Sequence, residues 1–365
     1  MFGLTDLPLL SVLQLFSGLA LLVAGAELLV RGAVRLAARL HVRALIIGLS
    51  IVAFGSSAPQ MAVSLQATLA ENSDIAVGSV IGSGIFNILV TLGLSALIIP
   101  LRVSRQLVRL DIPLMILASL LVFALAYNEE LTPLDGLILL ATLVLYLGLL
   151  LRQSRHSARP HSPQSCETPQ AHWLSSLLWM IGGLLLLVFA GHLLLRAAVE
   201  VATDLGLSER IIGLTIVAVG TSLPALATSL IAALRGQRDI AVGNVIGSNL
   251  FNLLGVLGFT ALVAPTPLSV SPNALDFDLP VMLGVAVLCL PVFYSGYRVT
   301  RAEGLLFLGL YLAYGLHVVS FTTGMPLAAK LEELMLFFVL PVLVAFLLFS
   351  SLRAWRRQHK KGEAQ

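Results

Sequence analysis

Residues 46–98 read IIGLSIVAFGSSAPQMAVSLQATLAENSDIAVGSVIGSGIFNILVTLGLSALI, and residues 211–263 read IIGLTIVAVGTSLPALATSLIAALRGQRDIAVGNVIGSNLFNLLGVLGFTALV. The two stretches align without a gap at an offset of 165, and 31 of their 53 positions are identical, which indicates an internal duplication. Each copy has a break of small and hydroxyl-bearing residues that ends in proline, GSSAP at 55–59 and GTSLP at 220–224. In lipid such a break persists only where it is buried in protein or lines a wet cavity, so the paired breaks predict a binding site near the midplane.

The composition is that of an integral membrane protein. Of the 365 residues, 58% are hydrophobic and 11% are charged, and the mean hydropathy is +0.97, which excludes a soluble globular protein or a nucleic-acid-binding domain. The two cysteines, Cys166 and Cys289, lack any metal or redox spacing, so we expect no cofactor. Eleven apolar runs are long enough to cross a bilayer as helices: 9–33, 43–69, 76–99, 107–127, 133–152, 174–198, 209–234, 241–264, 279–297, 303–322 and 334–351.

The duplication extends beyond the two quoted stretches. AGAELLVR at 24–31 matches FAGHLLLR at 189–196, and DIPLM at 111–115 matches DLPVM at 278–282. Spans one to five therefore correspond to spans six to ten, and an odd number of spans per copy forces opposite orientations in the membrane. We predict an all-α membrane protein with two inverted five-helix repeats, ten core helices and one extra C-terminal helix. The expected parts are a first repeat at 1–152, a cytoplasmic linker at 153–172, a second repeat at 173–325, and the extra helix with a basic tail at 326–365.

The distribution of charge predicts the orientation. Arginines follow the odd-numbered spans, as at Arg35, Arg39 and Arg43, whereas acidic residues such as Asp276 and Asp278 gather in the predicted even-numbered loops. Basic residues favour cytoplasmic loops. We expect a multi-pass protein of the cell inner membrane with its N-terminus outside and its C-terminus in the cytoplasm.

The polar residues of the duplicated stretches are the candidate ligands. Hydroxyls in the breaks can replace the hydration shell of an ion, or they can simply bond a carbonyl one turn earlier and ease the kink at the proline. Asn87 and Asn252 follow on the next helices, where an amide is either a ligand or a bond between helices. Two GxxxG segments, at 78–82 and 243–247, indicate close helix packing. Glu27 and Arg31, one turn apart in span one, favour a structural ion pair, and we expect no other acidic residue near the midplane.

The motifs GSSAPQ at 55–60, GTSLPA at 220–225, GSVIGSGIFN at 78–87 and GNVIGSNLFN at 243–252 closely resemble the two α-repeats of the cation/calcium exchanger superfamily, the sodium/calcium exchangers. The resemblance covers spans one to ten. It implies that spans two, three, seven and eight enclose the ions and that spans one and six slide to alternate access. The partners it implies are sodium, calcium or other small inorganic cations within a lipid bilayer. The ion-binding residues that it implies are Ser56, Ser57, Gln60, Ser83, Asn87, Thr221, Ser222, Ala225, Ser248 and Asn252.

The sequence departs from the family pattern at two ligand positions. The pattern has an acidic residue after each proline, where this chain has Gln60 and Ala225, so the expected site holds no carboxylate. Each missing unit charge forfeits about 4 kcal/mol per unit of cation charge at contact distance, which disfavours calcium. The expected function is a secondary active cation antiporter. The alternatives are transport of a monovalent cation or another small solute, or a family member without transport. An enzyme is not expected, because a hydrolase using Ser57 or Ser222 would lack a neighbouring base.

Overall fold

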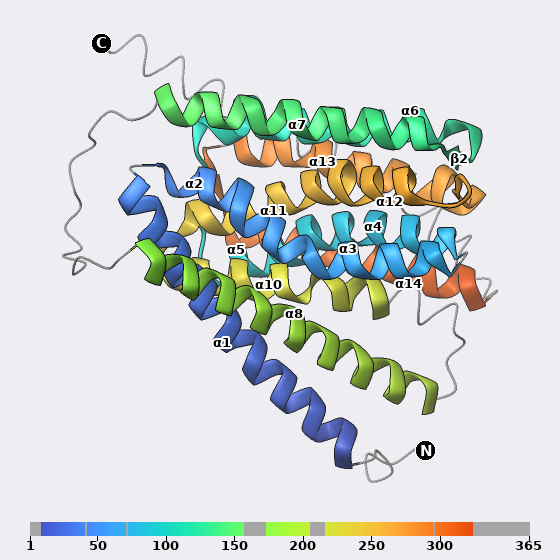
Figure 1. Ribbon diagram of the computed structural model, residues 1–365, viewed down its shortest axis with the longest axis horizontal. Helices are drawn as coiled ribbons and strands as arrows, with labels where there is room; N and C mark the ends of the chain where they lie inside the picture. The colour runs from blue at the N-terminus through green and yellow to red at the C-terminus, as the bar shows by residue number, and fades with distance from the viewer. Residues whose placement is uncertain are drawn as a thin grey trace.

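The computed structural model describes residues 9–40, 42–70, 72–156, 173–204, 216–294 and 296–323, and these are almost entirely helical (Figure 1). Within these ranges nine helices are long and apolar enough to cross a membrane, and a shorter apolar helix, Ala218–Leu234, lies among them. The prediction of an all-α membrane protein is confirmed. The expected eleventh span at 334–351 lies outside the described residues, as do the first residues of the span expected at 209–234 and most of the linker.

The first repeat contains five long helices, and a π-helical turn lies within the second, third and fourth of them. A π-turn widens the helix by one residue and shifts the side chains that follow it. The elements are α1 (Leu9–Leu40), α2 (Ala44–Ile47), η1 (Gly48–Val52), α3 (Ala53–Leu69), α4 (Ser73–Phe86), η2 (Asn87–Leu92), α5 (Gly93–Ile98), β1 (Leu101–Arg102), η3 (Leu107–Asp111), α6 (Ile112–Leu125), η4 (Ala126–Asn128), β2 (Glu130–Leu131) and α7 (Pro133–His156).

The second repeat has the same order of elements, and its π-turns η6 and η7 correspond to η2 and η3 of the first repeat. Conservation of these turns between the two copies shows that they belong to the repeat unit itself. The described elements are α8 (Trp173–Asp204), α10 (Ala218–Leu234), α11 (Arg238–Leu250), η6 (Phe251–Val256), α12 (Leu257–Val263), β3 (Leu268–Ser269), η7 (Ala274–Asp278), α13 (Leu279–Tyr294), β4 (Arg298–Val299) and α14 (Arg301–Thr323).

The prediction of interrupted helices at the two proline motifs is wrong. Helix α3 continues through Pro59 and helix α10 continues through Pro224. A proline in a helix removes one backbone donor, and neighbouring hydroxyls can supply a replacement. Here Ser56 Oγ lies 3.1 Å from the Ala53 carbonyl oxygen, and Thr221 Oγ1 lies 3.0 Å from the Val217 carbonyl oxygen. Both hydroxyls bond carbonyl oxygens of their own helix within the turn that precedes the proline, and each helix continues through its proline.

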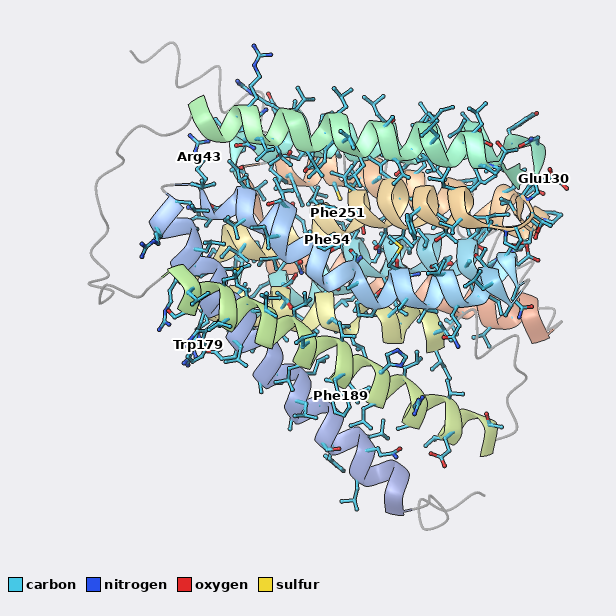
Figure 2. All side chains as sticks on the ribbon, viewed as in Figure 1. Arg43, Phe54, Glu130, Trp179, Phe189 and Phe251 are labelled. Atoms are coloured by element: carbon cyan, nitrogen blue, oxygen red, sulfur yellow. The ribbon has the colours of Figure 1, made fainter. Side chains whose placement is uncertain are left out.

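Four helices form the centre of the molecule: α3, α4, α10 and α11. In the membrane helix Ser73–Ile98 and in Arg238–Val263, 78% and 89% of the most apolar window is buried, against 22% in the peripheral helix Pro133–Gln153. In Figure 1 the α6–α7 layer covers one side of this centre, and the α1–α8 pair covers the other. Phe54 of α3 meets Phe251 of η6 edge to face, with ring centroids 5.7 Å apart (Figure 2).

Helices α1 and α8 form a tightly packed pair at the edge of the bundle (Figure 1). A Cβ atom at Gly183 of α8 would lie 2.5 Å from the Leu29 nitrogen of α1, so only glycine permits this approach. Many of the other side chains of the two helices point outward, and Phe189 is 60% exposed (Figure 2). The first and sixth spans therefore contact each other more extensively than they contact the four central helices.

Two very short antiparallel sheets join the repeats. Strand β1 pairs with β4, with Leu101 opposite Val299, and β2 pairs with β3, with Leu131 opposite Leu268. Strands β1 and β3 are equivalent in the two repeats, because each follows the third helix of its repeat, yet they lie in different sheets. Helix α6 separates β1 from β2, so the two sheets lie at opposite ends of the bundle (Figure 1). The equivalent loops emerge at opposite ends, as inverted repeats require.

The structure corrects the position of two acidic residues. Asp276 and Asp278, expected in a loop, lie in η7 at the start of the membrane helix Ala274–Tyr294. Asp278 is tolerated there because it accepts hydrogen bonds from the Asn273 amide nitrogen at 3.3 Å and from the Tyr314 hydroxyl at 2.9 Å.

The contact of α11 with the η1–α3 helix predicts the effect of a single methyl group. A Cβ atom at Gly247 would lie 2.6 Å from Ala53 Cβ and 2.7 Å from the Leu49 carbonyl oxygen. We expect Gly247→Ala to destabilise the protein by about 1–3 kcal/mol, because both neighbours are central and must shift. Thermal unfolding in detergent measures this as a lower Tm. Gly309→Ala is the matched control, since Gly309 of α14 has no neighbour within 4 Å. An equal Tm for both variants would contradict the packing.

Candidate ion-binding site

All ten predicted site residues lie on the four central helices or on η2 and η6, and all are buried. None of them is more than 5% exposed, so neither asparagine faces lipid. Ser56, Ser57 and Gln60 occupy consecutive turns of α3, while Asn87 and Asn252 each lie in a π-turn, at its start in η2 and one residue into η6. The full set consists of Ser56, Ser57, Gln60, Ser83, Asn87, Thr221, Ser222, Ala225, Ser248 and Asn252.

Hydrogen bonds between the repeats hold these residues in place. The Asn252 amide nitrogen donates to Ser83 Oγ at 2.9 Å, and the Asn87 amide nitrogen donates to Asn249 Oδ1 at 3.1 Å. Ser56 Oγ lies 2.9 Å from Ser248 Oγ. Each bond joins a side chain of one repeat to a side chain of the other, so the candidate site lies at the repeat interface.

An amide also bridges the two helices within each repeat. The Gln60 amide nitrogen of α3 donates to Ser79 Oγ of α4 at 2.9 Å and to Ser64 Oγ at 3.2 Å. In the second repeat the residue equivalent to Gln60 is Ala225, and the amide comes instead from Asn244, the residue equivalent to Ser79. The same kind of bridge is thus built from the opposite helix.

Asn244 makes two contacts within the second repeat and one contact to the first. Its amide nitrogen donates to Ser229 Oγ at 2.9 Å and to the Ala225 carbonyl oxygen at 3.1 Å. Its Oδ1 lies 2.9 Å from Ser56 Oγ. The Ala225 side chain itself offers only a methyl group. Of the predicted ligand positions, this one therefore contributes no side-chain oxygen.

Four oxygen atoms of the predicted residues have no hydrogen-bond partner among the described residues. They are Ser57 Oγ, Gln60 Oε1, Asn87 Oδ1 and Asn252 Oδ1. In all three amides the nitrogen is engaged and the oxygen is left over, which fixes the orientation of each amide. A buried polar atom without a partner costs about 1–3 kcal/mol. Oxygens that are held in place and unsatisfied are the ligands that a bare cation requires.

The hydroxyls of the second proline motif behave differently. Ser222 Oγ bonds the Ala218 carbonyl oxygen at 3.0 Å, and Thr221 Oγ1 bonds the carbonyl oxygens of Val217 and Ala218. The simpler alternative, in which the hydroxyl bonds its own helix, thus holds for both. Their oxygens retain lone pairs, but their protons are already committed within α10.

Sequence reasoning missed three polar residues of the interface. Ser79, Asn244 and Asn249 each bond a predicted site residue, as described above. Ser79 and Asn244 occupy equivalent positions in the two repeats, and the sequence alignment of the repeats shows that this position is polar in both. Asn249 is harder to find, because its equivalent is Gly84.

Carboxylates are absent from these contacts, and the described part of the chain holds no cluster of three or more metal-ligating side chains of His, Cys, Asp or Glu. Glu27 lies away from the site and pairs with Arg31 on its own helix, as expected, and also with Arg235 at the end of α10. Its Oε2 accepts from Arg235 Nε at 3.1 Å. Asp111 of η3 is fully buried, but it lies near the start of the membrane helix Leu107–Asn128 and not at its middle.

Comparison with known proteins agrees with this arrangement. The family described as sodium/calcium exchanger protein matches residues 10–152 and 175–320. The putative antiporter CaxA of Alkalimonas amylolytica is 37% identical over 313 residues, which cover 84% of this chain and 98% of that protein. The inner membrane protein YrbG of Escherichia coli is 38% identical over 286 residues, which cover 77% of this chain and 87% of that protein.

A solved structure shares the fold. The sodium-calcium exchanger NCX_Mj, determined after soaking with Na⁺ and Ca²⁺, superposes with a TM-score of 0.72 and 30% identity. The match covers 83% of this chain and 97% of that one. Three findings agree. The family match covers most of both repeats, two relatives exceed 30% identity along most of their length, and a solved structure has the same fold. The chain belongs to the sodium/calcium exchanger protein family.

Proposed function

We propose that the chain is a secondary active cation antiporter that works by alternating access and binds its cation at the repeat interface. The observation that carries this proposal is the group of four unpartnered oxygens, on Ser57, Gln60, Asn87 and Asn252. They come from both repeats, two from the first proline motif and one from each of the π-turns η2 and η6. A membrane protein keeps such unsatisfied groups in its interior only where they meet a ligand or water.

The neighbouring polar groups position these ligands. Ser83 and Asn249 hold the nitrogens of the two asparagines, and Ser79 holds that of Gln60, so each amide presents its oxygen. Because these partners belong to helices of both repeats, a movement of one repeat against the other would change the set of oxygens around the ion. This dependence supports alternating access.

The chemistry of the ligands favours a cation of low charge. Amide and hydroxyl oxygens supply dipoles but no net charge, and calcium affinity depends on the number of charged ligands. Each missing carboxylate costs about 4 kcal/mol of binding energy per unit of cation charge. A divalent ion therefore loses more binding energy than a monovalent one when two carboxylates are missing. We therefore favour a monovalent cation, such as sodium, as the better-held ion. The relatives named as sodium/calcium exchangers keep calcium as the alternative.

The edge pair α1–α8 is the part best suited to move. The two helices pack on each other through glycine and present apolar faces outward. An apolar face slides past neighbours and lipid without breaking hydrogen bonds. The Glu27–Arg235 ion pair ties α1 to the end of α10 at one end of the bundle, and it would have to open during such a movement.

The location follows from composition and orientation. We propose a multi-pass inner membrane protein, like the Escherichia coli relative. The arginine-rich ends of the odd-numbered spans support a C-terminus in the cytoplasm. A reporter fused after Gln365 should be active only in the cytoplasm, whereas activity outside the cell membrane would reverse the assignment.

The direct test is binding and flux with the purified protein. We expect calorimetry to show sodium binding that is stronger, relative to calcium, than in a carboxylate-bearing member of the family. Tracer exchange in liposomes should follow the same order.

Gln60→Ala should weaken cation binding at least tenfold, whereas Gln66→Ala, on the exposed face of the same helix, should not. Tight calcium binding by the unmodified protein would place the ligands elsewhere, and a protein that binds and moves no ion would be a non-transporting member.

Adding charge should convert the site. Gln60→Glu is nearly isosteric, and together with Ala225→Glu it supplies the two missing carboxylates. We expect the double variant to bind calcium at least a hundredfold more tightly than the unmodified protein, and each single variant to gain less. Without cation the two buried charges repel each other, so the Tm should fall in chelator and recover with calcium. Gln66→Glu is the charge-matched control, and no gain from the double variant would contradict the proposed ligand positions.

A further inference from the structure

A cluster of charged residues lies where the helix pair α1–α8 meets the C-terminus of α10. Glu27 of α1 accepts hydrogen bonds from Arg31, one turn further along α1, and from Arg235 directly after α10. Both guanidinium groups contact the same carboxyl oxygen, Oε1, so they lie side by side. Arg35 follows Arg31 by another turn and lies over the Trp179 ring of α8, 5.3 Å from its centroid. We call Arg31, Arg35, Arg235 and Trp179 the basic rim.

Positive charge exceeds negative charge at the basic rim. Glu27 is one carboxylate between two arginines, and Arg35 has no carboxylate partner among the described residues. Three guanidinium groups and one carboxylate leave a net charge of +2. A guanidinium has five N–H donors, and Glu27 accepts from one donor of Arg31 and two of Arg235. Because these two side chains are 46% and 51% exposed, donors remain accessible to a second anion.

The basic rim lies at the edge of the hydrocarbon layer. From Leu13 to Arg31, α1 rises about 27 Å, and the hydrocarbon core of a bilayer is about 30 Å thick. Tryptophan is enriched at the membrane–water interface, and arginine extends its charged group towards it. Figure 2 shows Trp179 near the start of α8, at the outer edge of the molecule. Exposed apolar side chains lead up to the rim on both helices, namely Phe16, Leu19 and Val23 of α1 and Ile181, Leu185 and Phe189 of α8.

The opposite end of the same helix pair lacks these features, although the duplication makes the two ends equivalent. The five equivalent positions there carry one positive and one negative charge: His192, Arg196 and Glu200 correspond to Glu27, Arg31 and Arg35, and Gln14 and Ala70 correspond to Trp179 and Arg235. The duplication alone therefore does not produce the basic rim. Its excess of positive charge is restricted to one face of the membrane.

We propose that the basic rim binds the headgroup of an anionic phospholipid of the surrounding bilayer. Guanidinium groups bind phosphate through paired N–H donors, and Arg31 and Arg235 present such donors side by side. An anionic headgroup brings no positive charge of its own, whereas a zwitterionic headgroup does and is repelled in part. The acyl chains of the lipid lie along the exposed apolar faces of α1 and α8. A soluble phosphate has the charge but not the chains, so the rim favours the lipid over the free anion.

The phospholipid and Glu27 compete for the same arginines. A phosphate that approaches Arg31 and Arg235 also approaches the Glu27 carboxylate, which is 21% exposed, and like charges repel. Glu27 therefore weakens lipid binding. Lipid binding in turn weakens the ion pair of Glu27 with Arg235, which ties α1 to α10. Binding of lipid at the rim does not depend on the proposed transport of a cation.

The fluorescence of Trp179 tests lipid binding in the full chain. Trp173→Phe and Trp355→Phe leave Trp179 as the one tryptophan, and brominated lipid quenches a tryptophan beside it. In phosphatidylcholine bilayers we expect brominated phosphatidylglycerol to reach half-maximal quenching at a fraction about fivefold lower than brominated phosphatidylcholine, or lower still. Inorganic phosphate at constant ionic strength should not restore the fluorescence. Equal quenching by both lipids, or recovery with inorganic phosphate, would overturn the proposal.

Variants distinguish the basic rim from surface charge in general. Arg35→Gln and Arg235→Gln should each lower the preference for phosphatidylglycerol about fivefold, and Glu27→Gln should raise it because the competing carboxylate is gone. Arg196→Gln, at the exposed equivalent of Arg31, is the charge-matched control and should leave the preference unchanged. Arg235→Gln keeps the test valid if Arg35→Gln alters the Trp179 ring or the fold, since Arg235 is exposed on another helix. A preference that survives both arginine variants, or that falls in Glu27→Gln, would contradict the assignment.

Discussion

A polar group inside a membrane protein must find its partner within the chain, because lipid offers none. The four central helices meet this constraint with side chains that bond across the repeat interface, as Asn252 does with Ser83 and Asn87 with Asn249. These bonds make the two repeats one structure. They also set apart the oxygens of Ser57, Gln60, Asn87 and Asn252, which have no hydrogen-bond partner among the described residues.

The two repeats share a backbone but not the same chemistry. An amide bridges the helices of both, yet it belongs to Gln60 of α3 in one repeat and to Asn244 of α11 in the other. Both amides reach equivalent serines, Ser64 and Ser229. Ala225 has no polar side chain, and Asn244 of the neighbouring helix supplies the bridging amide instead. The interface retains its hydrogen bonds while it carries no charge, which is the arrangement expected where a weakly charged ion binds.

The duplication, the inverted arrangement and the burial of the ten candidate residues could all be predicted from sequence, because they depend on repetition and hydropathy. The continuity of α3 through Pro59 could not, since a proline preceded by hydroxyl-bearing residues is compatible with a broken helix as well as with a continuous one. Asn244 was missed because its role appears only when Ala225 is compared with Gln60 across the interface.

The two short sheets have a consequence for how such a molecule could arise. Strand β1 pairs with β4, the equivalent of β2, and β2 pairs with β3, the equivalent of β1. In both sheets, therefore, the first strand of one repeat pairs with the second strand of the other. The same pairing occurs twice with the repeats exchanged, as in an isologous dimer. Two separate copies of one five-helix unit, inserted in opposite directions, could form both sheets without a covalent connection. The strand contacts between the two halves of this chain are those that such an antiparallel pair would make.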